Sequence, residues 1–283
     1  MLLKVKSQSF NLRNYTQKIV LKPPFCKYWA DPFIIVKNDV VFVYFEEYDL
    51  IKKIGSIKMV IVDGDSISRP IDIIKEDFHL SFPFIYESGG SYYMVPESHQ
   101  SNSIRLYKCI EFPGKWQYDG NLVPDINAVD TIIVTHNSIS YLLTSTESDV
   151  GVDKRSALCV YFANEATKIN GWSSLDKNPV SIKANGGRNA GNIVASQGSL
   201  FRVGQNNANS YGESISVFKI LEISKESYEE VLYTKIEPKL PFEFRIHTFN
   251  TDSNYAVYDR EIFRFEYWVS AQFFRILKMI KNK

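Results

Sequence analysis

The sequence predicts an all-β fold, namely a five-bladed β-propeller that is closed by an N-terminal strand and followed by a C-terminal amphipathic helix. One pattern recurs five times: a first residue, a strand, a short polar turn and a second strand. The five units begin at residues 31, 82, 130, 191 and 247, so the steps are 51, 48, 61 and 56 residues. Steps of this size between runs of short strands are typical of propeller blades. Aromatic residues make up 14% of the chain, which also favours strands.

The elements follow in order along the chain. Two short strand patterns, Leu2–Lys6 and Lys18–Leu21, precede Pro23 and Pro24. We expect an N-terminal strand to complete the last blade, because closing the ring removes open sheet edges. The expected blades run over 28–76, 78–125, 126–180 and 186–236, and a fifth begins near Phe242 and borrows N-terminal strands. No linker separates them, so residues 1–258 are predicted to form one domain.

The last segment, residues 259–283, has a different pattern. Its apolar residues recur at spacings of three and four, and Arg264, Arg275 and Lys278 are among the basic residues between them. This pattern predicts a basic amphipathic helix, which suits an anionic membrane surface. A helix packed against the outside of the propeller is the alternative interpretation.

Composition and charge exclude several classes of protein. The net charge is +1, which argues against nucleic acid as the main partner. Cys26, Cys109 and Cys159 are widely spaced and form no Cys-x-x-Cys motif, so we expect free thiols, no disulfide framework and no metal site. No secretory leader and no long apolar run is recognised, and no motif for a cofactor is present. We therefore expect a cytoplasmic protein, with a possible peripheral position on the inner membrane face through the C-terminal helix.

The repeat brings polar residues from distant parts of the chain to one end of the ring. Asp31, Asp130 and His247 each begin a unit, whereas Phe82 and Gly191 hold the same position in the second and fourth units. Loops that enter the innermost strands form a funnel in a propeller, and such a concave surface is the default binding site.

Carboxyl groups at equivalent positions of this funnel are the candidate catalytic residues. Acid–base chemistry on a glycosidic bond needs one ionised and one protonated carboxyl group. Asp31 and Asp130 are the first candidates. Glu97 lies fifteen residues after Phe82, as Glu46 does after Asp31, and Glu213 begins a strand in blade four. Each of these carboxylates could instead cap a turn or a strand end.

Two histidines and two arginines are candidates for binding substrate. His79 and His247 could donate hydrogen bonds to sugar hydroxyls or to a phosphate, or could be satisfied structural residues. Arg188 and Arg202 could hold a carboxylate or phosphate with two hydrogen bonds each, or could be surface residues.

An ordered series of motifs resembles a known family. The series is Trp29–Phe33, Phe78–Phe84, Tyr93–Ser98, Leu106–Lys108 with Phe112–Trp116, and Arg188–Asn192 with Arg202, Gln205, Tyr211 and Gly212. Over roughly residues 28–250 it looks like the propeller module at the N-terminus of plant glucosamine inositolphosphorylceramide transferases and of bacterial polysaccharide-assembly proteins. The resemblance adds Trp29, Gln205 and Tyr211 to the expected substrate-binding residues.

That module is in turn similar to five-bladed propeller glycosidases of the arabinanase and β-xylosidase type. Those enzymes use an aspartate base on blade one, a second aspartate on blade three and a glutamate acid on blade four. Asp31 and Asp130 match the first two by position, but the blade-four position holds Arg188–Gly191 and no glutamate. Glu97 or Glu213 would have to replace the missing acid.

The resemblance implies a carbohydrate-active enzyme of cell-surface polysaccharide or glycolipid assembly, and a glycosyltransferase is the first expectation. Its partners would be a sugar donor, possibly nucleotide- or phosphate-activated, and a glycan or lipid-linked acceptor. A phosphate leaving group needs less protonation, and Arg188 and Arg202 could neutralise it. A glycoside hydrolase and a non-catalytic glycan-binding module are the alternatives.

Overall fold

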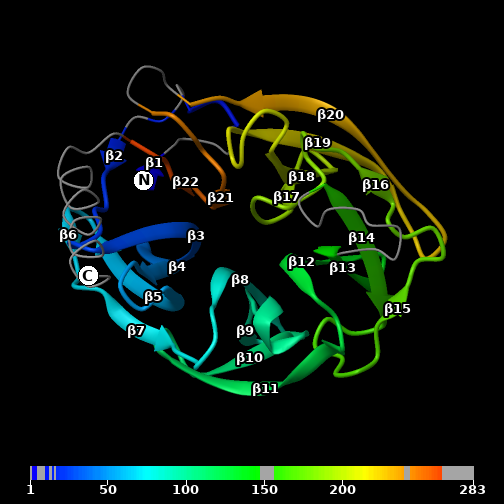
Figure 1. Cartoon of the computed structure of the whole chain (residues 1–283), viewed down its shortest axis with the longest axis horizontal. Coiled ribbons are helices and arrows are strands. Elements are labelled where there is room, and N and C mark those ends of the chain that lie inside the picture. Colours follow the sequence, from blue (N-terminus) through cyan, green and yellow to red (C-terminus); the bar gives the residue numbers. More distant parts are fainter. Residues whose placement is uncertain are drawn as a thin grey trace, which may run out of the picture.

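The computed structural model describes residues 2–4, 10–12, 15, 17–146, 156–238 and 243–262. In that part of the chain, five antiparallel sheets stand around a central axis (Figure 1). Four of the sheets are built from consecutive strands. The fifth is assembled from both ends of the chain, in the order β2-β1-β22-β21.

The four consecutive blades begin with β3, β8, β12 and β17, and the closing sheet begins with β21. Blade one contains β3 (Lys27–Lys37), β4 (Val40–Asp49), β5 (Ile54–Asp63), β6 (Ser66–Ile67) and β7 (Ile71–Ile74), and blade two contains β8 (Ser81–Ser88), β9 (Ser91–Glu97), β10 (Ser103–Glu111) and β11 (Lys115–Pro124). Blade three contains β12 (Ala128–His136), β13 (Ile139–Thr146), β14 (Ala157–Ala163), β15 (Ser173–Ser174) and β16 (Ser181–Ile182). Blade four contains β17 (Val194–Ser196), β18 (Ser199–Asn206), β19 (Ser214–Ile223) and β20 (Tyr228–Ile236). The closing sheet contains β21 (Phe249–Asp252), β22 (Tyr255–Tyr258), β1 (Leu2–Lys4) and β2 (Gln17–Ile19).

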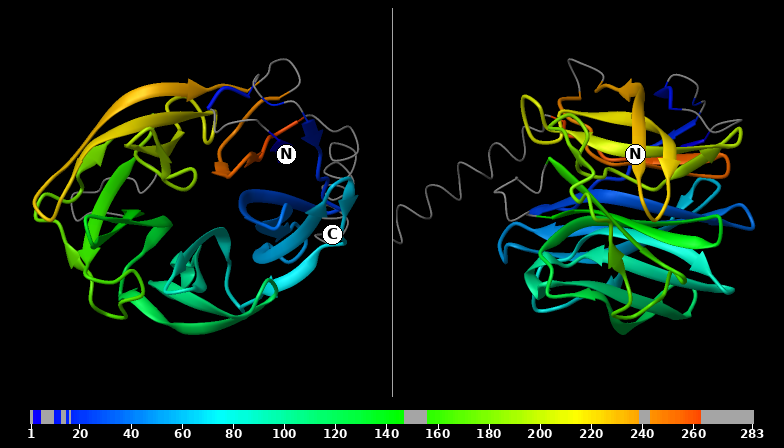
Figure 2. Two further views of the ribbon diagram at one scale, coloured as in Figure 1. Left: turned by 180° about the vertical axis from the view of Figure 1, so that it is seen from behind. Right: turned by 90° about the vertical axis from the view of Figure 1, so that its right-hand side faces the viewer.

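The predicted architecture needs correction. Closure uses both N-terminal strands, β1 and β2, which overlap the two predicted strand patterns, and β1 pairs with β22 (Figure 2). The structure therefore has four blades of consecutive strands and one composite sheet, and not five blades with an added strand. Its described residues contain no α-helix, and they include a 3-10 turn, η2 (His99–Ser101). The predicted C-terminal helix lies at residues outside the described part, which ends at 262. No described helix is long and apolar enough to cross a membrane.

The first hairpin of each consecutive blade turns in the same way. The two turn residues have positive φ in every case: Asn38 and Asp39, Gly89 and Gly90, Asn137 and Ser138, and Gln197 and Gly198. Two-residue turns of this kind match the right-handed twist of the flanking strands, and Asn, Asp and Gly tolerate them best. The turn residues thus fix the register of each inner strand pair.

The cores lie between neighbouring sheets. Blades one and two enclose Tyr44, Met59 and Leu80, and blade one packs on the closing sheet through residues such as Val43 and Val257. Further clusters join blades two, three and four, and blade four to the closing sheet. Each blade therefore buries both of its faces, which orients the inner strands firmly around the axis.

Candidate functional site

The inner strands of the first three blades share one irregularity at the predicted repeat position. Asp31, Phe82 and Asp130 have φ of 50°, 43° and 50°, and each lies in a break of the register between the first two strands of its blade. A β-bulge of this kind re-aims the side chain that it carries. Positive φ is tolerated by aspartate but is unfavourable for a bulky residue such as Phe82, so the surrounding structure must hold Phe82 in place.

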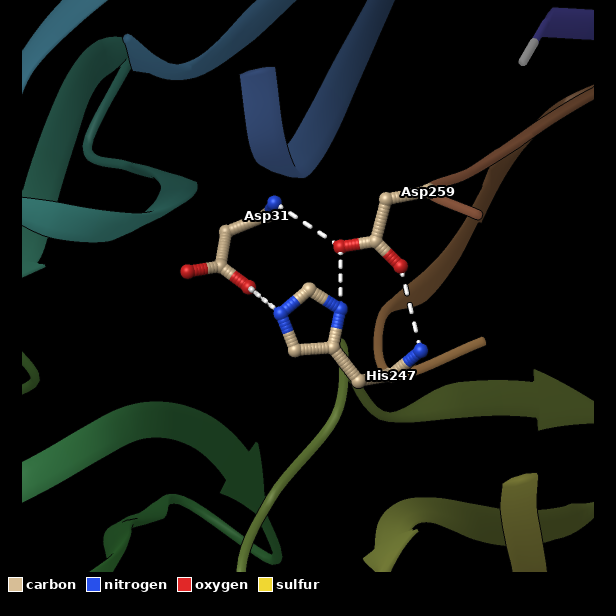
Figure 3. A group of neighbouring side chains, drawn as sticks. All are labelled: Asp31, His247 and Asp259. Carbon is tan, nitrogen blue, oxygen red and sulfur yellow. Dashed lines mark hydrogen bonds and ion pairs between the residues drawn. The ribbon is translucent and has the colours of Figure 1, made fainter. Parts of the chain in front are cut away.

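Asp31 belongs to a hydrogen-bonded group with His247 and Asp259 (Figure 3). His247 Nδ1 lies 2.5 Å from Asp259 Oδ2, and His247 Nε2 lies 3.7 Å from Asp31 Oδ1. Thr248 donates its hydroxyl hydrogen to Asp31 Oδ1 at 2.6 Å. The other carboxyl oxygen of Asp31 points away from the imidazole (Figure 3) and accepts no hydrogen bond from the described residues. That oxygen is the one available to a ligand.

Asp259 holds this group together. Its Oδ1 accepts the backbone N–H groups of His247 and Thr248 at 3.1 and 3.0 Å, and its Oδ2 accepts the backbone N–H of Asp31 at 3.1 Å besides His247 Nδ1. Burial alone would raise the pKa of Asp259, but the neighbouring His247 and these hydrogen bonds keep it lowered. Asp259 is therefore the fixed anion on which the histidine is oriented.

Asp31, His247 and Asp259 could in principle hold a metal, because one ligand atom of each lies within 4.8 Å of the others. A carboxylate offers about four lone-pair directions, and Asp259 already accepts four N–H groups. A cation would have to displace these donors. We therefore interpret the group as a carboxylate–imidazole–carboxylate relay.

The charge states of this relay follow from its contacts. Burial alone would lower the pKa of His247, but the charge and hydrogen bond of Asp259, together with Asp31, raise it to about 9. His247 is therefore a cation at neutral pH. Burial raises the pKa of Asp31, while His247 and Thr248 oppose the rise. Asp31 is thus a carboxylate of increased basicity that is held beside an imidazolium.

A second group centres on Arg188. It donates through Nε and Nη2 to the two oxygens of Asp130, with Nη2 at 3.2 Å from Oδ1, and Nη2 also lies 3.4 Å from Glu97 Oε2. The opposite oxygen of Glu97 lies 2.6 Å from His99 Nδ1. Asn189 donates to the backbone carbonyl of Asp130 at 2.8 Å and so fixes the bulge.

One proton is shared unequally by the two acids around Arg188. Burial raises the pKa of Asp130 to about 8, Arg188 opposes the rise, and the charges of Glu97 and Asp31 add to it. Burial alone would also raise the pKa of Glu97, but the hydrogen bond from His99 and the charge of Arg188 hold it at about 2. Asp130 is therefore the protonated member of this pair at neutral pH.

Tyr211 connects the two groups. Its ring stands edge-on to His247, with centroids 5.8 Å apart, and lies 5.5 Å from the Arg188 guanidinium. Gln205 hydrogen-bonds the Tyr211 hydroxyl and donates its backbone N–H to the carbonyl of Arg188. Gly212 has φ of +64°, and a Cβ there would lie 2.6 Å from the Cβ of His247, so glycine permits this close approach.

The structure brings most of the predicted site residues together. We call this set the central cluster: Asp31, His79, Glu97, Asp130, Arg188, Gln205, Tyr211 and His247, with Glu46, His99, Thr248 and Asp259 added by the structure. A cavity of about 790 Å³ adjoins it between blade one and the closing sheet, and Tyr28, Trp29, Tyr211, His247 and Asp259 are among its lining residues. Trp29 also donates its indole N–H to Glu47 at 2.9 Å.

Two predicted residues lie elsewhere. Arg202 is fully buried inside blade four, where it forms hydrogen bonds with Glu230, Asn189 and the carbonyl of Gly186. It has no surface for a ligand and instead supports Asn189. Glu213 accepts a hydrogen bond from Asn209 on the exposed rim of blade four and contacts no residue of the central cluster.

Three kinds of comparison place this geometry among known proteins. A family described as "Glucosamine inositolphosphorylceramide transferase 1, N-terminal" matches residues 18–241. Proteins called glucosamine inositolphosphorylceramide transferase 1 are 34% identical in Arabidopsis thaliana and 31% identical in Oryza sativa subsp. japonica, over 206 residues in each case. These matches cover 71% of this chain but only 26% and 27% of the relatives, so the chain spans about a quarter of their length.

Solved structures share the fold at low identity. An exo-β-1,3-galactanase from Clostridium thermocellum superposes with a TM-score of 0.57 at 12% identity, covering 75% of this chain and 50% of that one. An α-L-arabinofuranosidase from Podospora anserina, solved with cellotriose, gives 0.57 at 10% identity over 80% and 78%. A family 117 glycoside hydrolase from Zobellia galactanivorans gives 0.56 at 11% identity over 84% and 76%. Identities this low show a common fold alone.

Proposed function

We propose a function from one premise: this chain belongs to the family of glucosamine inositolphosphorylceramide transferase 1 N-terminal domains. Its central cluster binds and transfers a sugar during the assembly of a cell-surface polysaccharide or glycolipid. The observation that carries the proposal is geometric: Asp31 and Asp130 occupy equivalent bulges, Asp31 beside His247 and Asp130 beside Arg188. Asp31 is an anion supported by His247, and Asp130 retains a proton beside Glu97. Opposite protonation of two facing carboxyl groups is what acid–base chemistry at an anomeric carbon requires.

In this proposal Asp31 is the base. Its oxygen without a hydrogen bond takes the proton of an acceptor hydroxyl as that hydroxyl attacks the sugar, while His247 and Thr248 hold the opposite oxygen. A raised pKa makes the carboxylate a better base near neutral pH. Tyr211 and Trp29 offer ring faces toward the adjoining cavity, where the acceptor would lie.

The partners are a sugar donor and a glycan or lipid-linked acceptor. The names of the plant relatives refer to glucosamine and to inositolphosphorylceramide, which supports an amino sugar and a glycolipid among the candidates. A hydrolase would use the same residues with water as the acceptor, and product analysis separates the two reactions.

A non-catalytic glycan-binding module is the second candidate. The two-point contact of Arg188 with Asp130 favours it, because that contact restrains a carboxyl group that catalysis would need to use. Such a module would bind sugars at the same residues without turnover.

The variant Asp31→Asn tests the proposal. Turnover of a panel of nucleotide sugars and aryl glycosides should fall by about 10²- to 10⁴-fold, whereas sugar affinity measured by calorimetry should change only a few-fold. Asp39→Asn is the matched control, since Asp39 lies at the far turn of the same hairpin and tolerates asparagine. Undiminished turnover in Asp31→Asn contradicts the assignment of the base, and sugar binding by a wild-type protein without any turnover supports the module.

We also propose a cytoplasmic location at the inner membrane face, with residues 263–283 as the contact. Arginine and lysine recur among the aromatic and aliphatic residues of that segment. Co-sedimentation of the full chain with anionic liposomes should exceed that of a chain ending at residue 262. Equal sedimentation of the two contradicts the proposal.

A further inference from the structure

A buried carboxyl group lies between blades one and two and has no role in the reaction described so far. Glu46 on β4 is 4% exposed, and its Oε1 has no hydrogen-bond partner among the described residues. A buried carboxyl oxygen without a partner carries a free-energy cost, so its presence calls for a reason. The nearest polar neighbour is His79 Nε2, at 3.6 Å from Oε1.

The protonation of His79 is fixed by the backbone. Gly55 donates its N–H to His79 Nδ1 at 3.0 Å, so Nδ1 is an acceptor without a proton. Burial lowers the pKa of His79, and the ring is therefore neutral at neutral pH. A neutral imidazole with a free lone pair on Nδ1 carries its hydrogen on Nε2, which is the atom that faces Glu46.

Glycine at position 55 makes this arrangement possible. A Cβ at Gly55 would lie 2.7 Å from both Glu46 Oε1 and His79 Cε1, and 2.5 Å from the carbonyl oxygen of Leu80. Any larger residue would push the two side chains apart. The backbone of β5 therefore forms a pocket in which the carboxyl group and the imidazole meet.

The tautomer of His79 decides which oxygen of Glu46 holds the proton. Burial raises the pKa of Glu46 well above its usual range, and the charges of Asp31 and Glu97 add to the rise, so the group is a neutral acid. Its Oε1 faces the Nε2–H of His79 at 3.6 Å, beyond hydrogen-bond distance, and a hydrogen on Oε1 would point against that N–H. The hydrogen must then lie on Oε2, which donates to no described residue.

We propose that Glu46 is the proton donor of the central cluster and that the donor substrate is a glycoside with an alcohol leaving group. This inference rests on the proposed function and narrows its substrate class. The blade-four segment Arg188–Gly191 contains no glutamate, so the leaving group has no acid from that segment. Asp130 carries a proton, but Arg188 donates to both of its oxygens and restrains it, so Asp130 does not serve as the donor. A phosphate leaving group would have to compete with Asp130 and Glu97 for Arg188, which already donates to both carboxyl groups.

The proposed step balances in atoms and charge. The bond between the anomeric carbon and the leaving oxygen breaks, its electron pair stays on that oxygen, and the oxygen takes the hydrogen of Glu46 Oε2. The hydroxyl oxygen of the acceptor alcohol bonds to the anomeric carbon, and its proton passes to Asp31. Glu46 ends as a carboxylate and Asp31 as an acid, and exchange of one proton through solvent restores both.

Glu46→Gln is the decisive variant, because glutamine has the shape and hydrogen-bonding groups of a protonated glutamate and should preserve the fold. Wild type and variant are compared on methyl glycosides and on 4-nitrophenyl glycosides of the same sugars. Turnover should fall at least 100-fold on the methyl glycosides and less than about fivefold on the nitrophenyl glycosides, whose leaving group needs no proton. Equal losses on the two series, or no loss on the methyl glycosides, would overturn the inference.

The matched control is Glu47→Gln. Glu47 is the next residue of β4, is also buried, and faces Trp29, Lys27 and Lys58 on the other side of the strand. It should show no dependence on the leaving group. If the wild-type protein turns over no substrate at all, both the proposed function and the role of Glu46 are contradicted. If the wild-type protein turns over nucleotide sugars and Glu46→Gln retains that turnover, only the role of Glu46 is contradicted.

A second measurement needs no substrate. The infrared difference spectrum between wild type and Glu46→Gln at pH 7 should contain the carbonyl band of one protonated carboxylic acid. The same band should be present in the spectrum of Asp130→Asn, which shows that it does not come from Asp130. If the difference shows only carboxylate bands, Glu46 is ionised and the proposal fails.

Discussion

The pairing of His247 with Asp259 predicts that alkaline pH destabilises this fold in a defined window. The pKa of His247 is raised from 6.5 to about 9 by Asp259 and Asp31, despite burial, which acts in the opposite direction. A folded-state pKa above the unfolded value contributes stability that is complete below pH 6.5 and is lost as the pH rises through about 9. The shift corresponds to about 2 to 3 kcal/mol of unfolding free energy, with some allowance for the 23% of the ring that solvent reaches.

The assay is urea unfolding at a series of pH values between 6 and 9.5, for wild type and for His247→Asn. The asparagine amide can replace Nδ1 as a donor to Asp259 but cannot become a cation, so the variant keeps the hydrogen bond and loses the titration. Other titrating groups, Asp130 among them, affect both proteins and cancel in the difference. Wild type should lose its advantage over the variant as the pH rises from 6.5 to 9. A difference that stays constant over this range would refute the raised pKa of His247.

Two further predictions concern stability. Arg202→Met should cost about 3 to 5 kcal/mol in urea unfolding, because it removes the buried guanidinium partner of Glu230 and leaves only Lys183, at 3.8 Å. The double variant with Glu230→Gln should recover most of the loss, and a double variant as unstable as the single one would contradict the pairing. Gly191→Ala should lower the unfolding free energy by at least about 2 kcal/mol, because a Cβ there would lie 2.0 Å from the carbonyl oxygen of Phe249. Gly114→Ala, where nothing lies within 4 Å of the added Cβ, should be neutral in the same urea unfolding experiment, and equal effects at the two glycines would contradict the packing argument.

The sequence was most informative where local chemistry decides the structure. Turn residues with a preference for positive φ, such as Asn38 and Asn137, mark the inner hairpins directly. The spacing of the units then predicts equivalent positions for Asp31 and Asp130, and the structure shows that both positions are β-bulges. Periodicity carries this information because every blade repeats the same turn and the same inner strand.

Residues defined by contacts between distant strands could not be predicted in this way. Asp259 follows β22 without a motif, and only the fold of the closing sheet brings it to the backbone of Asp31, 228 residues away. Arg202 resembles a ligand-binding arginine in sequence, but β18 turns it toward Glu230 on β20. The use of N-terminal strands in the last sheet was predicted from the repeat, but the order β2-β1-β22-β21 depends on pairing between the chain ends, which no local pattern encodes.

His247 and His79, two of the three histidines in the central cluster, show how the fold sets opposite charge states with the same side chain. His247 Nδ1 faces a carboxylate, which favours the imidazolium, whereas His79 Nδ1 faces a backbone N–H, which requires a lone pair and therefore the neutral ring. Each ring then presents Nε2 to a carboxyl group: the cation stabilises Asp31 as an anion, and the neutral ring leaves Glu46 to keep its proton. Titration of the two imidazoles can be followed by ¹⁵N NMR. If His79 and His247 lost their protons over the same pH range, the two rings would not hold Glu46 protonated and Asp31 ionised, and the assignment of Glu46 as the acid and Asp31 as the base would be contradicted.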